Sequence, residues 1–221
     1  MICAAGTGIW AIEMGDMFPS AEIIGTDLSP GQAQWVPPNV RFEIDDARED
    51  WTFPKDHFDF IHVRTLAGSI QDWPAFIKQC YDHLKPGGTL EIAEGRANQW
   101  YAHDTVKEDS FTYKWLMEWR KLSVQLQFDV FPKLKGMVEQ LPFENIQVTE
   151  KLTPMTPWPK DKRLKEIGRV MMVQFLEMGL EAYTLALFTR FGGWNELELK
   201  ALIAQVKEEY KTQKMHLYTF M

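Results

Sequence analysis

Two glycines and one acid near the start of the chain have the spacing of a nucleotide-binding turn. Gly6 and Gly8 flank Thr7, and Asp27 follows Gly8 by 19 residues. In open parallel sheets a glycine-rich turn lets the backbone approach a ligand, and an acid about 20 residues further on accepts hydrogen bonds from ribose hydroxyls. Taken alone, however, Gly-Thr-Gly is equally consistent with a tight turn that binds nothing.

Two further signals follow in order along the chain. Asp46 and Ala47 come directly after the next expected strand, where a carboxylate is placed to accept a hydrogen bond from an adenine amino group. The turn Lys85–Gly88, with the sequence Lys-Pro-Gly-Gly, precedes a later strand. This order predicts a ligand crevice at the carboxyl ends of the strands.

His62 and Arg64 are the candidates for chemistry beyond binding, because both fall near the carboxyl end of the third expected strand. A histidine at this position suits a general base, although a strand histidine near a helix is more often a hydrogen-bonded structural residue. Arg64 is equally suited to pairing with a surface acid. Cys3 and Cys80 form no Cys-x-x-Cys or Cys/His cluster, so no metal site is predicted.

The expected elements alternate between helix and strand through the first half of the chain. Because each parallel strand needs a crossover connection, this alternation predicts an α/β fold with a doubly wound, mostly parallel sheet. The expected helices are Ile9–Met17 and Trp73–Leu84, and the expected strands are Ala21–Asp27, Val40–Ile44, Phe58–Val63 and Thr89–Ala93.

The second half of the chain is richer in helical patterns and is expected to form a helical cap. We expect one domain over residues 1–221, with a cofactor-binding half (1–98) and a cap that also holds the last strands (99–221). The expected elements are helices near Asp109–Gln127, Lys160–Leu187 and Glu196–Thr212, and a strand over Phe143–Lys151.

Composition excludes several functional classes. The chain has 221 residues, a formal charge of -7 and a pI near 5.3, which argue against a general binder of nucleic acid. No run approaches the roughly 18 uninterrupted apolar residues of a spanning helix, and residues 1–20 lack the basic start of a signal peptide. We therefore expect an intracellular protein, cytoplasmic or nuclear, without a nucleic-acid or membrane partner.

Together these motifs resemble class I S-adenosylmethionine-dependent methyltransferases, which have a Rossmann-like fold. The resemblance narrows to the fungal LaeA-like group and covers nearly the whole chain. The stretches that carry it are GTGIWAIEMGD, IIGTDLSPGQAQWVPPNVRFEIDDA, FDFIHVRTLAGSIQDWP, PWPKDKRLKEIG and LEAYTLALFTR.

The resemblance implies a site for S-adenosylmethionine and a role for each candidate residue. The cofactor-binding residues would be Gly6, Thr7 and Gly8 against the methionine part, Asp27 on the ribose, Asp46 near the adenine, Leu28 and Ala47 beside the base, and Arg64 toward the methionine end. His62 is the candidate catalytic base. The implied partner is a small-molecule acceptor of fungal secondary metabolism, with a regulatory protein partner as the other class.

The start of the chain departs from the family pattern. Ile2 stands where the usual acid ends the first strand, and Ala4 replaces the usual first glycine. We expect an amino-terminally truncated chain in which the first strand is missing, so that its neighbours lose ladder hydrogen bonds. Two alternatives stay open: a non-catalytic protein that keeps the fold, and a nicotinamide-dependent oxidoreductase.

Overall fold

The structure, a computed structural model, describes residues 1–96, 100–212 and 214–221. Contacts divide the chain into two compact units. The sheet unit comprises Met1–Glu94 and Lys133–Ile146, and the helical unit comprises Gly95–Pro132 and Gln147–Met221. The border expected between residues 98 and 99 lies outside the described residues.

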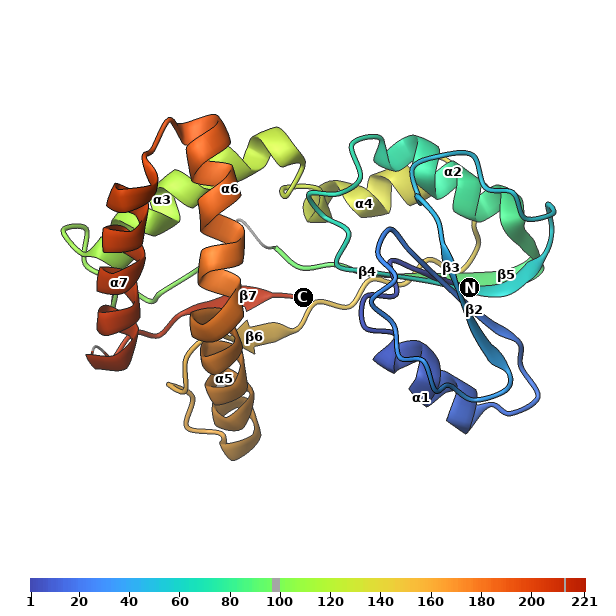
Figure 1. Cartoon of the computed structure of the whole chain (residues 1–221), viewed down its shortest axis with the longest axis horizontal. Coiled ribbons are helices and arrows are strands. Elements are labelled where there is room, and N and C mark those ends of the chain that lie inside the picture. The colour runs from blue at the N-terminus through green and yellow to red at the C-terminus, as the bar shows by residue number, and fades with distance from the viewer. Residues whose placement is uncertain (97–99, 213) are drawn as a thin grey trace. The chain divides into compact units, whose positions relative to one another are not determined.

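The sheet unit is built on five parallel strands in the order β3-β2-β1-β4-β5 (Figure 1). The chain runs outward from β1 to β3 and then returns to β4 beside β1. The switch point of the sheet therefore lies between β1 and β4, and the predicted doubly wound parallel sheet is confirmed. The strands are β1 (Ile2–Cys3), β2 (Ile23–Asp27), β3 (Val40–Ile44), β4 (Phe58–Arg64) and β5 (Leu84–Ala93).

The expectation of a missing first strand is wrong. Ile2 pairs with Gly25 on one side and His62 on the other, and Cys3 continues both ladders. Two buried residues thus fill the central position of the sheet, because each extended residue offers hydrogen bonds to both neighbours. Burial at this position also raises the pKa of the Cys3 thiol to about 12, so the thiol stays protonated.

Two helices of the sheet unit flank the sheet, with α1 on one side and α2 on the other (Figure 1). Helix α1 (Ile9–Met17) has the predicted bounds, and its Gly15 is so close to Val40 that a Cβ there would lie 2.3 Å from Val40 Cγ2. Helix α2 (Trp73–His83) begins after Asp72, whose side chain accepts a hydrogen bond of 3.0 Å from the backbone N–H of Ala75.

The prediction that the Lys-Pro-Gly-Gly turn precedes a strand is wrong. The turn lies inside that strand, which is β5. β5 starts at Leu84, and its register against β4 shifts between Phe58 and Phe60. Gly87 has a φ of +82°, which only glycine adopts without strain. The turn is therefore a bulge, in which the extra residues are taken up without ending the pairing.

The helical unit contains most of the remaining helices and a two-stranded antiparallel sheet. The predicted helix over Lys160–Leu187 is confirmed as one continuous helix that extends to Gly192. By length and composition alone, Lys162–Gly192 could cross a membrane, although core helices of soluble proteins meet the same criteria. The elements of the helical unit are α3 (Phe111–Ser123), η1 (Val124–Leu126), β6 (Leu152–Pro154), α5 (Lys162–Gln174), the π-helical η2 (Phe175–Gly179), α6 (Leu180–Gly192), α7 (Glu196–Thr212) and β7 (Tyr218–Phe220). Most of α4 (Phe131–Val138) belongs to the sheet unit.

The strand predicted over Phe143–Lys151 is wrong, and α4 was not predicted. Ladder pairing begins only near the end of that range, where Lys151 and Met221 exchange backbone hydrogen bonds, and β6 itself starts at Leu152. Alternating apolar residues mark a strand only where a second strand lies alongside, and the partner β7 reaches no further.

Aromatic side chains form much of the core of the helical unit. Trp115 packs its ring against Trp119 at 6.0 Å and Phe175 at 5.4 Å between centroids. Its indole N–H is buried and donates a hydrogen bond of 2.8 Å to the hydroxyl of Thr184 on α6. Because this indole N–H is buried, water cannot take the place of the Thr184 hydroxyl as its acceptor.

Replacing Thr184 by valine is therefore expected to lower the free energy of unfolding by ~1 to 3 kcal/mol, the usual cost of an unsatisfied buried donor. Thr189 on the same helix provides a control, because its hydroxyl is exposed and bonds only to carbonyls of its own helix. Thr189→Val should change stability by less than ~0.5 kcal/mol. Urea unfolding of both variants tests this, and equal costs would contradict a special role for the Thr184 hydroxyl.

Candidate functional site

The predicted glycine turn lies at the carboxyl end of β1, beside the switch point of the sheet. The turn is tied to β2 by the backbone N–H of Ala5, which donates to the carbonyl of Thr26 at 2.9 Å. Gly8 closes it by donating to the Ala5 carbonyl, also at 2.9 Å, and then begins α1. Gly6 and Gly8 have positive φ angles of 58° and 78°, so the turn needs residues that tolerate a left-handed backbone conformation.

The two glycines meet different surroundings. A Cβ on Gly8 would lie 2.4 Å from Cζ of Phe42, so the ring lies directly against the turn. A Cβ on Gly6 would have no other atom within 4 Å. Gly6 and Thr7 are exposed. The backbone at Gly6 is therefore open to a ligand, while Gly8 is needed for packing against the sheet. Ala4, which replaces the usual first glycine, also has a positive φ of 54°.

Asp27 ends β2 and points its carboxylate toward the glycine turn. Its Oδ2 accepts the backbone N–H of Gly6 at 2.8 Å, and its Oδ1 accepts the backbone N–H of Ser29 at 2.9 Å. A carboxylate has about four acceptor sites, so these two bonds leave further sites for hydroxyl donors. The sequence-based pairing of Asp27 with the glycine turn is therefore matched by a direct hydrogen bond between them.

Asp46 follows β3, the strand that pairs with β2. The backbone N–H of Asp45 donates to the Asp27 carbonyl at 3.0 Å, which continues the β2–β3 ladder to the loop. The carboxylate of Asp46 is held by Arg48, whose Nη2 is 2.6 Å and whose Nε is 2.9 Å from the two carboxylate oxygens. This guanidinium lowers the pKa of Asp46 to about 2.

Replacing Arg48 by alanine is expected to raise the pKa of Asp46 toward its ordinary value of 3.8. Because the folded-state pKa is lowered, the ion pair stabilises the fold above pH ~4, and that contribution is lost as the pH falls through about 2. Carbon NMR titration of the aspartate carboxyls measures the shift. A pKa for Asp46 that is the same with and without Arg48 would contradict the pairing.

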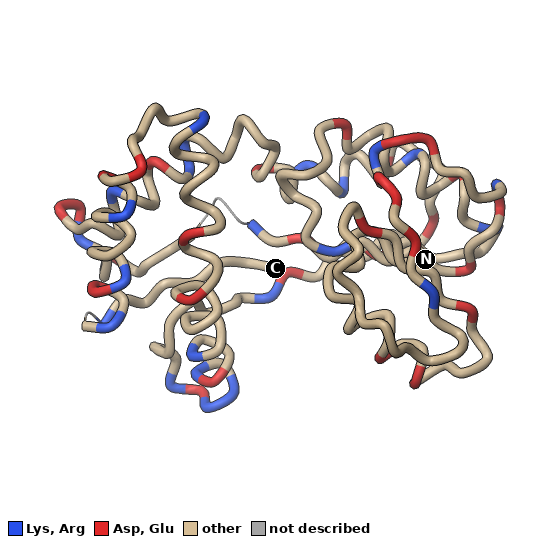
Figure 2. Tube along the Cα trace, viewed as in Figure 1, with Lys and Arg blue, Asp and Glu red and all other residues tan. Residues whose placement is uncertain are grey.

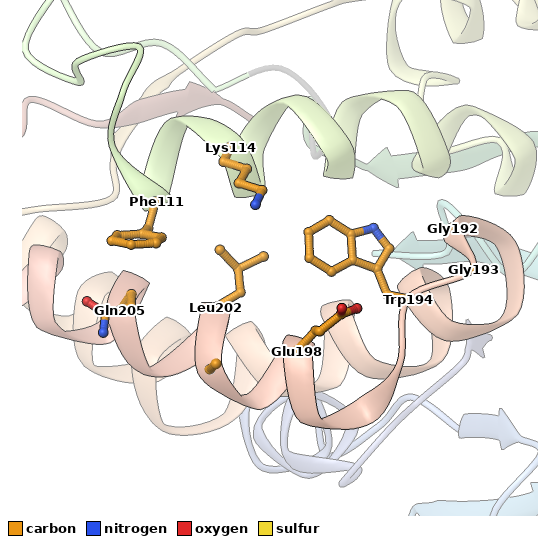
Figure 3. A pocket seen from close by; sticks show the side chains of 9 residues that line it. Phe111, Lys114, Gly192, Gly193, Trp194, Glu198, Leu202 and Gln205 are labelled. Atoms are coloured by element: carbon orange, nitrogen blue, oxygen red, sulfur yellow. The ribbon is translucent and has the colours of Figure 1, made fainter.

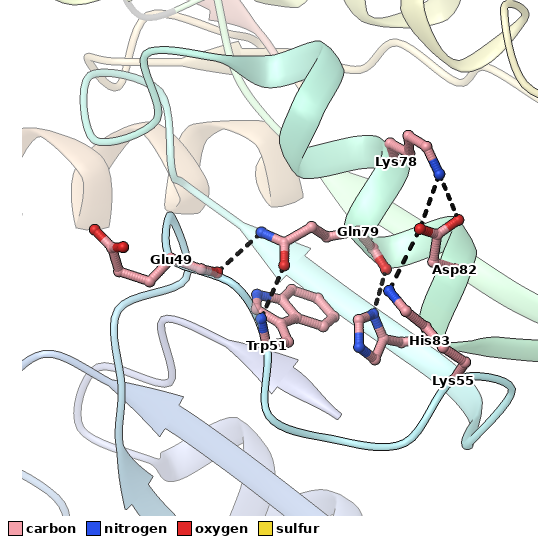
Figure 4. Close-up of polar contacts among 7 residues, drawn as sticks. All are labelled: Glu49, Trp51, Lys55, Lys78, Gln79, Asp82 and His83. Atoms are coloured by element: carbon pink, nitrogen blue, oxygen red, sulfur yellow. Dashed lines mark hydrogen bonds and ion pairs between the residues drawn. The ribbon is translucent and has the colours of Figure 1, made fainter.

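Hydrogen bonds from Gln79 of α2 anchor the loop that contains Asp46 and Ala47 (Figure 4). The side-chain amide of Gln79 donates to the Glu49 carbonyl at 3.0 Å and accepts the backbone N–H of Trp51 at 2.9 Å. The indole N–H of Trp51 in turn donates to the carbonyl of Ala47 at 3.2 Å. Sequence reasoning missed Gln79, because nothing in its local pattern shows that it faces a loop 30 residues earlier.

Apolar side chains are exposed at the same edge of the sheet. Leu28, which follows Asp27, is 62% exposed, and Ile44 at the end of β3 is 68% exposed. Asp27 and Ile44 are register partners, so these two apolar side chains belong to neighbouring strand ends. An exposed apolar pair beside hydrogen-bonding groups is suited to a flat, partly polar ligand such as a purine base. Leu28 was predicted, whereas Ile44 was missed.

His62 and Arg64 lie on β4 but in different surroundings. Arg64 is the last residue of the strand and is exposed at the carboxyl edge of the sheet. His62 is buried within the strand, where its ring stacks on Trp10 of α1 at 3.9 Å and its Nδ1 lies 2.7 Å from Oε2 of Glu91. The structure thus brings Arg64, but not His62, to the edge that carries Gly6, Asp27 and Asp46. These contacts give His62 a packing role, and its role as a base stays a prediction.

A cavity of about 700 Å³ lies in the helical unit, and none of the residues that line it is a predicted site residue (Figure 3). Phe111 and Trp194 face each other across Leu202, and the ammonium of Lys114 lies 5.3 Å from the centre of the Trp194 ring. It is an open groove between α3 and α7, and none of the motifs discussed above contributes to it. The complete lining is Phe111, Lys114, Gly192, Gly193, Trp194, Glu198, Ala201, Leu202 and Gln205.

Comparison with known proteins places the chain in a family. Residues 4–148 match the family described as a methyltransferase domain. The secondary metabolism regulator LAE1 of Cochliobolus heterostrophus is 34% identical over 219 residues, which cover 96% of this chain and 71% of that protein. The chain therefore belongs to the methyltransferase-domain family and, within it, to the fungal LaeA-like group.

A second relative is more similar in sequence. The methyltransferase pytC of Aspergillus terreus is 43% identical over 217 residues, which cover 96% of this chain. The chain spans 65% of the length of pytC. Both relatives align over almost the entire chain, so the resemblance seen in the motifs extends through the sheet unit and the helical unit.

Solved structures agree with this fold. The [4+2]-cyclase SpnF has a TM-score of 0.53 at 17% identity, with 99% of this chain and 70% of that chain covered. Phosphoethanolamine N-methyltransferase 2 of Haemonchus contortus, solved with S-adenosyl-L-methionine, has a TM-score of 0.50 at 18% identity, with 99% of this chain and 46% of that chain covered. At these identities the likeness concerns the fold alone.

Proposed function

We propose that this chain is an S-adenosylmethionine-dependent methyltransferase that acts in, or regulates, fungal secondary metabolism, with a small molecule as the methyl acceptor. The observation that carries the proposal is the Asp27 carboxylate, bonded to Gly6 of the glycine turn at the switch point of a parallel sheet. This is where open α/β sheets bind ligands. The family assignment and the methyltransferase name of pytC support it.

The residues at this edge fit the adenosyl part of such a cofactor. Asp27 has acceptor sites left for the two ribose hydroxyls, and the open backbone beside Gly6 leaves room for a ligand. Leu28 and Ile44 would hold the base between apolar side chains, with Asp46 near its amino group. The residues present therefore match the shape and polarity of an adenosine.

Charges of both signs lie at this edge. Asp27 ends β2, and Asp45 and Asp46 follow β3, with further acids behind them in the chain (Figure 2). Asp46 is paired with Arg48, and Arg64 adds a positive charge at the end of β4, so these five residues together carry a small negative charge. Such a mixed edge suits a ligand that has both a sulfonium and a carboxylate, as S-adenosylmethionine does. The family assignment favours the methyltransferase over the oxidoreductase.

The protein's part in the reaction is chiefly to align the reactants. S-adenosylmethionine, when bound, supplies an electrophilic methyl carbon on a sulfonium, and transfer is an in-line displacement. Asp27 and the glycine turn fix the adenosyl end, which sets the direction of the methyl group relative to the acceptor. Arg64, exposed at the end of β4, is placed to hold an anionic group such as the methionine carboxylate. His62 is kept only as the candidate base.

Calorimetric titration of the purified chain with S-adenosylmethionine, S-adenosylhomocysteine and NAD tests the proposal. Binding of both adenosyl ligands, with no heat from NAD, is the expected result. A non-catalytic relative of the same fold is the alternative, and the fold likeness to a [4+2]-cyclase shows that this architecture is not restricted to proteins named methyltransferases. Heat from none of the ligands would favour that alternative, and heat from NAD alone would favour an oxidoreductase.

A further inference from the structure

Four residues of the sheet unit form a closed ring of hydrogen bonds around the glycine turn. As described above, the backbone N–H groups of Gly6 and Ser29 donate to the two oxygens of Asp27. The side-chain nitrogen of Gln32 donates to the carbonyls of the same two residues, at 2.8 Å to Gly6 and 2.9 Å to Ser29. Gly6 and Ser29 are thus each held at their N–H by an acid and at their carbonyl by an amide.

The chemistry of Gln32 suits this position closely. A carboxamide nitrogen has two hydrogens, and here each meets one carbonyl. The two carbonyls come from different segments, the glycine turn after β1 and the loop after β2. Gln32 therefore joins these segments without using any acceptor site of Asp27.

We propose that Gln32 is a positioning residue for the adenosyl ligand, an inference that rests on the proposed function. In the bound state Asp27 accepts hydrogen bonds from the ribose hydroxyls as well as from two backbone N–H groups, so the position of its carboxylate is set by the ligand as much as by the turn. Gln32 holds the carbonyl of Gly6 independently of Asp27. The turn therefore keeps its shape in the bound state, and less ordering has to accompany binding.

Two substitutions separate this role from simple packing. Gln32→Met keeps the length of the side chain but removes both donors. Gln32→Glu keeps the shape but turns oxygen atoms toward two carbonyls and adds a negative charge beside Asp27, the titratable group in the ring. A protonated glutamic acid can donate one hydrogen bond again. The nearby Asp27 carboxylate and the two carbonyls disfavour the charged form of a glutamate at this position, which raises its pKa above the ordinary ~4.3. The affinity of the Gln32→Glu variant should therefore recover in part, relative to wild type, as the pH is lowered from about 8 to about 5.

The matched control is Gln34→Met, because Gln34 lies on the same loop and is exposed. Calorimetry with S-adenosylhomocysteine, urea unfolding and hydrogen exchange of the Gly6 amide are measured on wild type and all variants. We expect Gln32→Met to bind about tenfold more weakly, as loss of two hydrogen bonds predicts. Its Gly6 amide should exchange faster, while unfolding and the Gln34→Met variant stay close to wild type.

The outcomes distinguish the two proposals. If wild type binds S-adenosylhomocysteine and Gln32→Met binds it within about twofold, with no pH recovery in Gln32→Glu, the role of Gln32 is refuted and the proposed function stands. If wild type binds no adenosyl ligand, the proposed function fails and the role of Gln32 fails with it. Weaker binding by Gln32→Met that is matched by an equal loss of folding stability would show a structural role only, and would also overturn the proposal.

Discussion

Replacing Gly8 by alanine is expected to destabilise the protein by ~2 to 5 kcal/mol. The new Cβ would lie 2.4 Å from the Phe42 ring, so the ring or the turn has to move. Phe42 also packs against Gly25, where a Cβ would lie 2.6 Å from the ring, so the ring is in contact on a second side. The estimate combines ~1 to 3 kcal/mol for overpacking with ~1 to 2 kcal/mol for a φ of +78° in a residue other than glycine.

Gly6→Ala is the matched control for this prediction. Gly6 also has a positive φ, but its Cβ would meet open space, so only the backbone cost of ~1 to 2 kcal/mol is expected. Urea unfolding of the two variants gives the comparison. Adding Phe42→Ala to Gly8→Ala should remove the steric part of the cost, as a double-mutant cycle would show. Equal losses for Gly8→Ala and Gly6→Ala would contradict the packing argument.

Replacing Asp27 by alanine is expected to have the largest effect on ligand binding. Hydrogen bonds between hydroxyls and a charged acceptor contribute ~1.5 to 3 kcal/mol each, so loss of both ribose contacts predicts a weakening of at least about 100-fold. The backbone N–H groups of Gly6 and Ser29 also lose their acceptor, but both are exposed and can bond to water. Folding stability should therefore change much less than affinity.

Asp59→Ala controls for the loss of a carboxylate from the same unit. Asp59 lies near the amino-terminal end of β4, is exposed and pairs with Lys85, 2.8 Å away. Its removal should leave the affinity for S-adenosylhomocysteine unchanged, because it lies at the opposite edge of the sheet. Calorimetry on both variants measures this. Comparable affinities for wild type and Asp27→Ala would show that the ligand is held elsewhere.

Sequence patterns predicted the sheet unit well because its signals are local. Helix Ile9–Met17 and strand Val40–Ile44 have the predicted bounds. The glycine turn and Asp27 meet as their spacing indicated. Turn residues and acids at strand ends mark where a strand stops and the chain changes direction, so these features can be predicted from a short stretch of sequence.

The features that sequence missed depend on contacts between distant residues. The sequence predicts no first strand because only five residues precede Gly6, yet two of them form β1, which is paired on both sides in the centre of the sheet. The range Phe143–Lys151 was predicted as a strand, but strand pairing reaches only its last residue, and β6 begins at Leu152. Gln32 and Gln79 look like ordinary polar loop and helix residues until the carbonyls that they hold are known.

A crystal structure of the chain with S-adenosylhomocysteine tests the central claim most directly. The account predicts both ribose hydroxyls within hydrogen-bonding distance, about 3 Å, of the Asp27 carboxylate, with the adenine between Leu28 and Ile44. A ligand bound away from the carboxyl ends of β1 and β2, or one whose ribose makes no contact with Asp27, would contradict it.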